Sequence, residues 1–151
     1  MGGSGIIAQT IQLALAPVFV LVAIGNIMNI LSVRLGRIVD RSRYLQQMHP
    51  ATEGAEHDRI VIEIRLVDRR IALIGKAILR LVLSGLTIGF CVALLFVEEL
   101  FKVNLQQVAG AAFFVSVLLL MSALWLFLKE TREATASLRI PETYLELERK
   151  L

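Results

Sequence analysis

The distribution of charged residues constrains this chain more than any other feature of its sequence. No Asp, Glu, Lys or Arg occurs before Arg34, between Arg80 and Glu98, or between Lys102 and Lys129. A helix of about 20 apolar residues crosses a hydrocarbon layer of about 30 Å, and the charge-free segments approach or exceed that length. The sequence therefore predicts three membrane-spanning helices, at about 11–33, 77–97 and 108–128.

Composition supports a single membrane domain that covers residues 1–151. Hydrophobic residues make up 56% of the 151 residues, and the net charge is +3. Soluble domains are about 45–50% apolar, and a chain of this length rarely forms more than one compact unit. The predicted spans leave a segment at about 34–76 between the first two helices and a segment at 129–151 after the third.

Basic residues are concentrated on one side of the predicted spans. Ten Lys or Arg lie from Arg34 to Arg80 and five follow Leu128, whereas the connection between the second and third spans holds only Lys102. Cytoplasmic segments of membrane proteins carry the excess of Lys and Arg. We therefore expect the N-terminus outside, and the segment 34–76 and the C-terminus in the cytoplasm. The first apolar run is too long for a signal peptide, and no basic residue precedes it.

Apolar residues continue at helical spacing beyond the first two spans. Past the first span the stripe consists of Leu31, Leu35, Ile38 and Leu45. On the second helix a heptad pattern runs through Ile60, Ile64, Val67, Ile71, Ile74, Ile78, Leu81, Gly85, Ile88, Val92 and Leu95. Such a pattern is typical of a coiled coil.

The ends of these two helices follow from the residues that break the pattern. We expect the first helix to run from near Ile11 to near Met48, where His49-Pro50 and Gly54 predict a turn. The second helix is expected to restart near Asp58. At about 1.5 Å per residue, 58–97 would form a rod of about 60 Å, twice the hydrocarbon thickness.

The predicted fold is therefore all-α: a bundle of three transmembrane helices whose first two helices extend into a cytoplasmic helical hairpin. A short amphipathic helix is expected at the C-terminus, because Ile140, Tyr144, Leu147 and Leu151 follow a helical spacing. Pro141 suits the first turn of such a helix. Its apolar face is expected to dock on the hairpin or on a neighbouring subunit.

Asn26 and Asn29 are the most unusual residues of the predicted spans. They are three residues apart and share one helix face, which Arg37 continues, with Arg34 at the cytoplasmic end of the span. An unpaired amide is costly in hydrocarbon, so both should face other helices or water. One interpretation is interhelical hydrogen bonding. The other is a pore, in which these residues form polar rings of an oligomer.

Two further sets of residues are candidates for contacts. Gly85, Gly89 and Ala93 recur at four-residue spacing and predict a helix-packing face, because small residues let two backbones approach closely. Lys76 and Arg80 lie near the predicted inner edge of the membrane, where they could bind acidic lipid headgroups. A solvated basic face that only sets the topology is the simpler interpretation of this second pair.

Residues suited to catalysis or cofactor binding are scarce. The sequence has no Ser-His-Asp arrangement in a suitable context and no Gly-rich phosphate loop. His49 and His57, near the expected turn, match no metal-binding motif, and the single Cys91 reads as a packing residue. The acidic residues Glu63 and Asp68 lie among the basic residues of the second helix, which argues against nucleic-acid binding. We therefore expect neither an enzyme nor a metal, cofactor or nucleic-acid site.

The stretch 16–45 resembles an uncharacterised bacterial family of small three-span inner-membrane proteins, described as a domain of unknown function. The most recognisable parts are Gly25-Asn26, Asn29 and the segment Arg-Ile-Val-Asp-Arg at 37–41. The resemblance extends over most of the chain and ends before the last helix. It implies a bacterial inner-membrane location, and it supplies no activity, substrate or site.

Two functions remain open at this point. The first is a non-catalytic helical scaffold or accessory subunit that contacts the lipid bilayer and assembles with copies of itself or with another membrane protein. The second is a homo-oligomeric ion channel lined by the first transmembrane helix, whose basic inner mouth predicts anion preference. The continuous heptad pattern and the shortage of reactive groups favour the scaffold.

Overall fold

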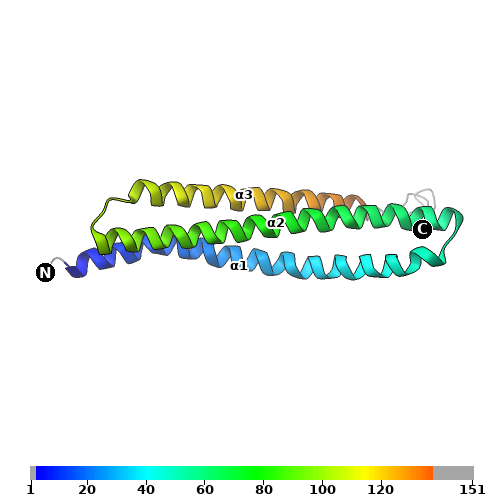
Figure 1. Cartoon of the computed structure of the whole chain (residues 1–151), viewed down its shortest axis with the longest axis horizontal. Helices are drawn as coiled ribbons and strands as arrows, with labels where there is room; N and C mark the ends of the chain where they lie inside the picture. Colours follow the sequence, from blue (N-terminus) through cyan, green and yellow to red (C-terminus); the bar gives the residue numbers. More distant parts are fainter. Residues whose placement is uncertain (1–2, 138–151) are drawn as a thin grey trace, which may run out of the picture.

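The computed structural model describes residues 3–137, with side chains placed for 11–12 and 14–135. These residues form α1 (Gly3–Met48), a short 3-10 helix η1 (His49–Ala51), α2 (Gly54–Phe101) and α3 (Gln106–Ser137). The described part of the chain contains no strand, so the prediction of an all-α fold is confirmed. Figure 1 shows three long helices side by side, with α2 between α1 and α3.

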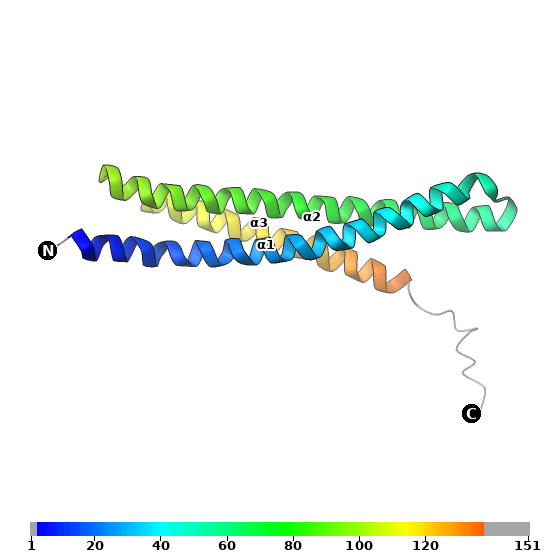
Figure 2. The same ribbon diagram turned by 90° about the horizontal axis from the view of Figure 1, so that it is seen from below.

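Large apolar side chains at seven-residue intervals hold α1 against α2. We call the set of these buried residues the aliphatic seam: Pro17, Ile24, Leu31, Ile38 and Leu45 of α1, and Ile60, Val67, Ile74, Leu81 and Ile88 of α2. Figure 2 shows that the two helices cross and continue together as far as η1. The heptad pattern predicted for the second helix therefore does mark its buried face.

A second seam, built from small residues, joins α2 to α3. This small-residue seam also has seven-residue spacing and consists of Ala77, Ser84 and Cys91 of α2 and Ala109, Ser116 and Ala123 of α3, all buried. The Ser84 hydroxyl donates to the Ser116 carbonyl oxygen at 2.8 Å, and the Ser116 hydroxyl donates to the Ser84 carbonyl oxygen at 2.9 Å. Cys91 Sγ lies 3.3 Å from the Ala109 carbonyl oxygen. Side chains this short reach a neighbouring backbone only where two helices approach closely.

The helices begin earlier than the sequence pattern predicted. α1 starts at Gly3 rather than near Ile11, and α2 starts at Gly54 rather than near Asp58. Gly54 has φ of 63°, a left-handed conformation that glycine adopts without a Cβ clash. The chain therefore reverses direction within a few residues and resumes the helix at once. The predicted end of the first helix at Met48 is confirmed.

All three helices are long and apolar enough to cross a membrane. Within the described residues the candidate spanning segments are Ala14–Ala51, Gly54–Phe101 and Gln106–Thr135. α3 continues without a break past Leu128 to Ser137. The amphipathic helix expected around Pro141 lies outside the described residues.

Candidate functional site: a buried ion cluster and a polar face of α1

One charged cluster joins all three helices. Glu130 of α3 is fully buried, and its two carboxylate oxygens bind two arginines from different helices. Arg34 of α1 donates from Nη2 to Oε2 at 2.9 Å. Arg70 of α2 donates from Nε and Nη2 to Oε1 at 3.0 and 2.9 Å. We call Arg34, Arg70 and Glu130 the ion cluster.

Both oxygens of the buried carboxylate have arginine partners, which compensate its charge. Taking a carboxylate out of water is costly unless partners satisfy its charge and its lone pairs. Both arginine side chains keep part of their surface exposed, 32% for Arg34 and 25% for Arg70, so they are only partly desolvated. The Arg34 guanidinium also lies 5.3 Å from the centre of the Phe127 ring, a cation–π contact.

The position of the ion cluster is as informative as its chemistry. Arg34 is the first charged residue of α1, and Glu130 is the second charged residue after the long apolar part of α3. Arg70 and Glu130 also continue the seven-residue spacing of the small-residue seam, since Arg70 precedes Ala77 by seven residues and Glu130 follows Ala123 by seven. The cluster thus connects the helices where the apolar segments of α1 and α3 end.

Two weaker ion pairs lie on the same side of the ion cluster as η1. Arg69 of α2 binds Glu133 of α3 at 2.9 Å, and Arg41 of α1 binds Glu63 of α2 at 2.7 Å. These side chains are largely exposed, except for Glu133, which is about three-quarters buried. Exposed pairs contribute little to stability, so these contacts add little to the hold of the helices on one another.

The two candidate headgroup residues have different surroundings. Arg80 is half-buried and donates from Nη1 to the Ser122 carbonyl oxygen of α3 at 3.3 Å. Lys76 is exposed. A charged side chain at the edge of a membrane span is tolerated when it faces the bundle interior, and Arg80 has this arrangement. Of the two, only Lys76 presents its charge to the surroundings of the bundle.

The polar residues of α1 divide into two groups. Arg34 turns toward α3 and joins the ion cluster, whereas Asn26, Asn29 and Arg37 are exposed. Asn26 lies two residues after Ile24 and Asn29 two residues before Leu31, which places each amide about 160° around the helix from the aliphatic seam. Neither amide side chain has a hydrogen-bond partner within the part of the chain that the structure describes. They therefore do not hold α1 to α2.

The stripe of Gly85, Gly89 and Ala93 contacts α1 only at one end. A Cβ added at Gly85 would lie 3.6 Å from Leu21 Cδ1, an ordinary van der Waals distance. Gly89 and Ala93 are exposed, and nothing lies within 4 Å of a Cβ added at Gly89. Close packing inside the chain runs instead through the small-residue seam, which faces α3.

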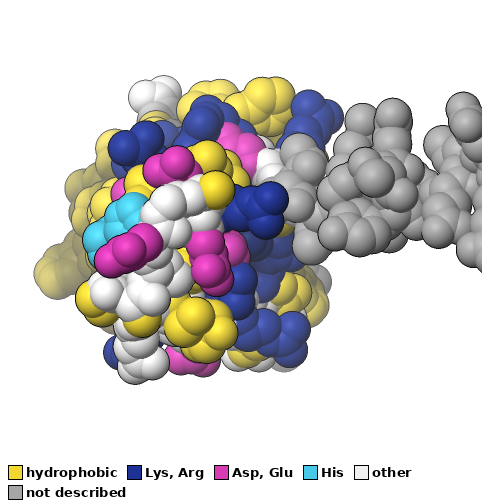
Figure 3. Space-filling model, turned by 90° about the vertical axis from the view of Figure 1, so that its right-hand side faces the viewer, with side chains coloured by type: hydrophobic (Ala, Val, Ile, Leu, Met, Phe, Trp, Pro, Cys, Tyr) yellow, Lys and Arg dark blue, Asp and Glu magenta, His cyan; other side chains and the backbone are white. Residues whose placement is uncertain are grey.

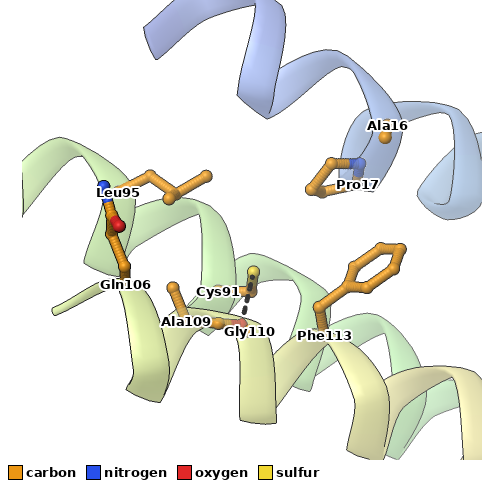
Figure 4. A pocket seen from close by; sticks show the side chains of 8 residues that line it. All are labelled: Ala16, Pro17, Cys91, Leu95, Gln106, Ala109, Gly110 and Phe113. Atoms are coloured by element: carbon orange, nitrogen blue, oxygen red, sulfur yellow. Dashed lines mark hydrogen bonds between the residues drawn. The ribbon is translucent and has the colours of Figure 1, made fainter.

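A groove of about 520 Å³ opens at the end of the bundle away from η1. Figure 4 shows Pro17 of α1 on one side, Cys91 and Leu95 of α2 on another, and Gln106 and Phe113 of α3 below them. No charged side chain is among the residues that line it. The groove therefore offers a largely apolar surface without a charged side chain.

The end of the bundle at η1 is strongly charged, as Figure 3 shows. There the rings of His49 and His57 meet edge to face, with centroids 4.5 Å apart. The Thr52 hydroxyl lies 3.4 Å from His57 Nδ1 and 3.3 Å from the His49 carbonyl oxygen. Among the residues the structure describes, no three His, Cys, Asp or Glu side chains lie together as a metal site. The contact between the rings of His49 and His57 stabilises the turn between α1 and α2.

Comparison with known proteins assigns the chain to a family. The model of the family described as "Protein of unknown function (DUF2721)" matches residues 14–140, which is most of the chain. The chain belongs to this family. The resemblance expected from 16–45 is thereby confirmed for the family. No curated protein and no solved structure matches the chain.

Sequence reasoning missed the two central features of this DUF2721 chain. The sequence predicted no role for Glu130, which falls in the segment 129–151, and no seam between α2 and α3. A signal for both was present, because Ala, Ser or Cys recurs every seven residues at 77–91 and at 109–123, and the same spacing continues to Arg70 and Glu130. Helical wheels drawn for large residues alone overlook this pattern.

Proposed function

We propose that this DUF2721 protein is a non-catalytic helical scaffold or accessory subunit of a bacterial inner membrane and that it acts as an oligomer. The observation that carries the proposal is the ion cluster. One buried carboxylate on α3 binds an arginine from α1 and an arginine from α2. The three helices are therefore connected at one position along the bundle. Such a fixed arrangement suits a protein that presents surfaces to partners.

The hairpin beyond the ion cluster supports this function. From Arg34 to Met48, α1 continues for about 21 Å, and α2 returns beside it. Ile38, Leu45, Ile60 and Val67 keep the aliphatic seam buried over this length. We propose that the hairpin is a two-stranded coiled coil in the cytoplasm, where it would present a rigid charged surface.

The charge distribution supports the orientation. The hairpin and the end of α3 carry most of the Lys and Arg, and the α2–α3 connection carries Lys102 alone. We propose an external N-terminus and a cytoplasmic C-terminus. The segment after Pro141 would add a short amphipathic helix on the cytoplasmic side.

The mass of the protein in its native lipids tests the scaffold. The full chain, extracted in polymer-bounded nanodiscs, is expected to give a mass of two or more 16.8 kDa chains, or of a defined complex with another membrane protein. In inside-out vesicles, a cysteine at Thr52 in a Cys91→Ala background should react with a membrane-impermeant maleimide. A strictly monomeric chain without a partner, or labelling of position 52 only from the periplasmic side, would contradict the proposal.

A second candidate, a homo-oligomeric ion channel lined by α1, is favoured by the exposure of Asn26, Asn29 and Arg37 on one side of the bundle. Basic residues at the inner mouth would give anion preference. Chloride flux into proteoliposomes should then fall to the level of empty liposomes in the variant Asn26→Leu with Asn29→Leu. Val22→Leu, on the same face, serves as a matched control for added volume. Absence of flux in the unmodified protein leaves the scaffold as the function.

A further inference from the structure

The exposed face of α1 has a composition that packing within one chain does not explain. Six exposed residues alternate at four- and three-residue spacing, and we call them the outer face of α1: Val18, Val22, Gly25, Asn29, Ser32 and Gly36. Such spacing places them along one line of the helix, as at the contact positions of a coiled coil. The aliphatic seam lies on the other side of the helix.

Asn29 is the central residue of this face and has no hydrogen-bond partner among the described residues. Asn29 lies within the charge-free segment of α1, five residues before Arg34. An amide in such surroundings gains a great deal from a partner, since lipid tails offer none. A carboxamide both donates and accepts, so a second asparagine amide can donate to it and accept from it.

The glycines on the outer face provide independent support. Among the described residues, nothing lies within 4 Å of a Cβ added at Gly25 or at Gly36, so no contact seen there requires a glycine at either position. Glycine weakens a helix, whereas its small size permits close approach of a second helix. Gly25 and Gly36 lie on either side of Asn29 along the outer face, which suits a neighbouring helix that runs alongside.

The occupant that fits this surface is a second copy of the same chain. In the orientation proposed above, all copies insert into the membrane in the same way. The α1 helices of two neighbouring copies then run parallel, and their Asn29 residues lie at the same depth. A two-fold axis along the membrane normal then brings the same residues of both copies together. We infer that two chains pair through the outer face of α1, with the Asn29 amides hydrogen-bonded across the axis.

This inference rests on the proposed scaffold function, because it names the chain with which the scaffold assembles. It argues against a water-filled passage along α1, because Asn29, which would line that passage, is covered by the partner copy. A single asparagine at a contact position is also a known means of selecting two parallel helices in register.

Oxidative cross-linking in native membranes tests the pairing. In a Cys91→Ala background, single cysteines replace Val22 or Ser32 on the outer face, and Leu118 on the exposed side of α3 as a control. Gly89→Cys examines the exposed small residues of α2 as a rival contact. Disulfides form only where the two Cα atoms come within about 7 Å, so covalent dimers are expected from Val22→Cys and Ser32→Cys and not from the other two.

The role of Asn29 has its own readout. Asn29→Leu is expected to lower the yield of dimer from Val22→Cys about fivefold, while Asn29→Gln retains most of it. Helix content and thermal unfolding of the monomer should not change, because Asn29 is exposed and has no hydrogen-bond partner among the described residues. A native mass of two chains should accompany the cross-links.

The possible results separate this inference from the scaffold. Dimers that form equally well through Leu118→Cys or Gly89→Cys would overturn the pairing through α1 and leave an oligomeric scaffold intact, as would a mass of three or more chains. A strictly monomeric protein that neither cross-links nor co-purifies with a partner would overturn both.

Discussion

Replacing Glu130 by glutamine is expected to be among the most destabilising single substitutions in this protein. The amide keeps the size of the side chain but removes the charge that holds Arg34 and Arg70 together. Breaking a buried ion pair costs roughly 3–5 kcal/mol, because the remaining charges stay desolvated without a counterion. Both arginines are partly exposed, so we expect about 3 kcal/mol, measured as the free energy of unfolding in mixtures of mild detergent and SDS.

Two further variants distinguish this explanation from general sensitivity of α3. Glu133→Gln removes the neighbouring pair with Arg69, whose side chain is 62% exposed, and is expected to cost less than about 1 kcal/mol. Replacing all three members of the ion cluster by leucine should recover most of the lost stability, since apolar residues often substitute well for a buried ion triad. Equal losses for Glu130→Gln and Glu133→Gln would show that the cluster does not hold the helices.

Ser84→Leu is expected to have the second largest effect, through steric exclusion rather than charge. Ser84 and Ser116 are fully buried where α2 and α3 approach, and each hydroxyl reaches the backbone of the other helix. A leucine forces the helices apart and breaks the contacts of Cys91 and Ala77 on either side. Overpacking of a tight contact costs about 2–3 kcal/mol, and the loss should appear as a lower unfolding temperature.

The matched variants make the origin of this effect measurable. Ser84→Ala removes the hydroxyl without adding volume, and such hydrogen bonds between membrane helices contribute about 0.6 kcal/mol. Val82→Leu adds volume two residues away at an exposed position and should leave the unfolding temperature unchanged. If Ser84→Ala destabilised the protein as much as Ser84→Leu, hydrogen bonding and not close approach would hold α2 to α3.

The distinction between the two seams of α2 explains which predictions were successful. The contact between α1 and α2 uses large aliphatic residues, and a stripe of isoleucine and leucine is easily recognised in a sequence. The contact between α2 and α3 uses Ala, Ser and Cys, which also occur on lipid-facing surfaces and therefore do not identify a buried face. Gly85, Gly89 and Ala93 are as small as the true seam, yet two of the three are exposed.

The polar residues of α1 show the same limit. The sequence predicts one polar set on the first helix, because four polar or charged residues lie within a dozen positions: Asn26, Asn29, Arg34 and Arg37. In the folded chain, Arg34 turns to Glu130, which is 96 residues away in sequence, while the other three remain exposed. Which of these side chains faces a neighbouring helix depends on the rotation of α1, and that rotation is set by the aliphatic seam.

The sequence by itself determined three apolar helices, their approximate ends and the buried stripe of the central helix, because these depend on local charge and on spacing along one helix. Only the tertiary structure decided that α3 packs through small residues and that Glu130 joins both arginines. It also decided that Asn26 and Asn29 have no hydrogen-bond partner within the described part of the chain. These features depend on how the helices are rotated and aligned against each other. Rotation and alignment arise from the packing of all three helices together, and no single segment encodes them.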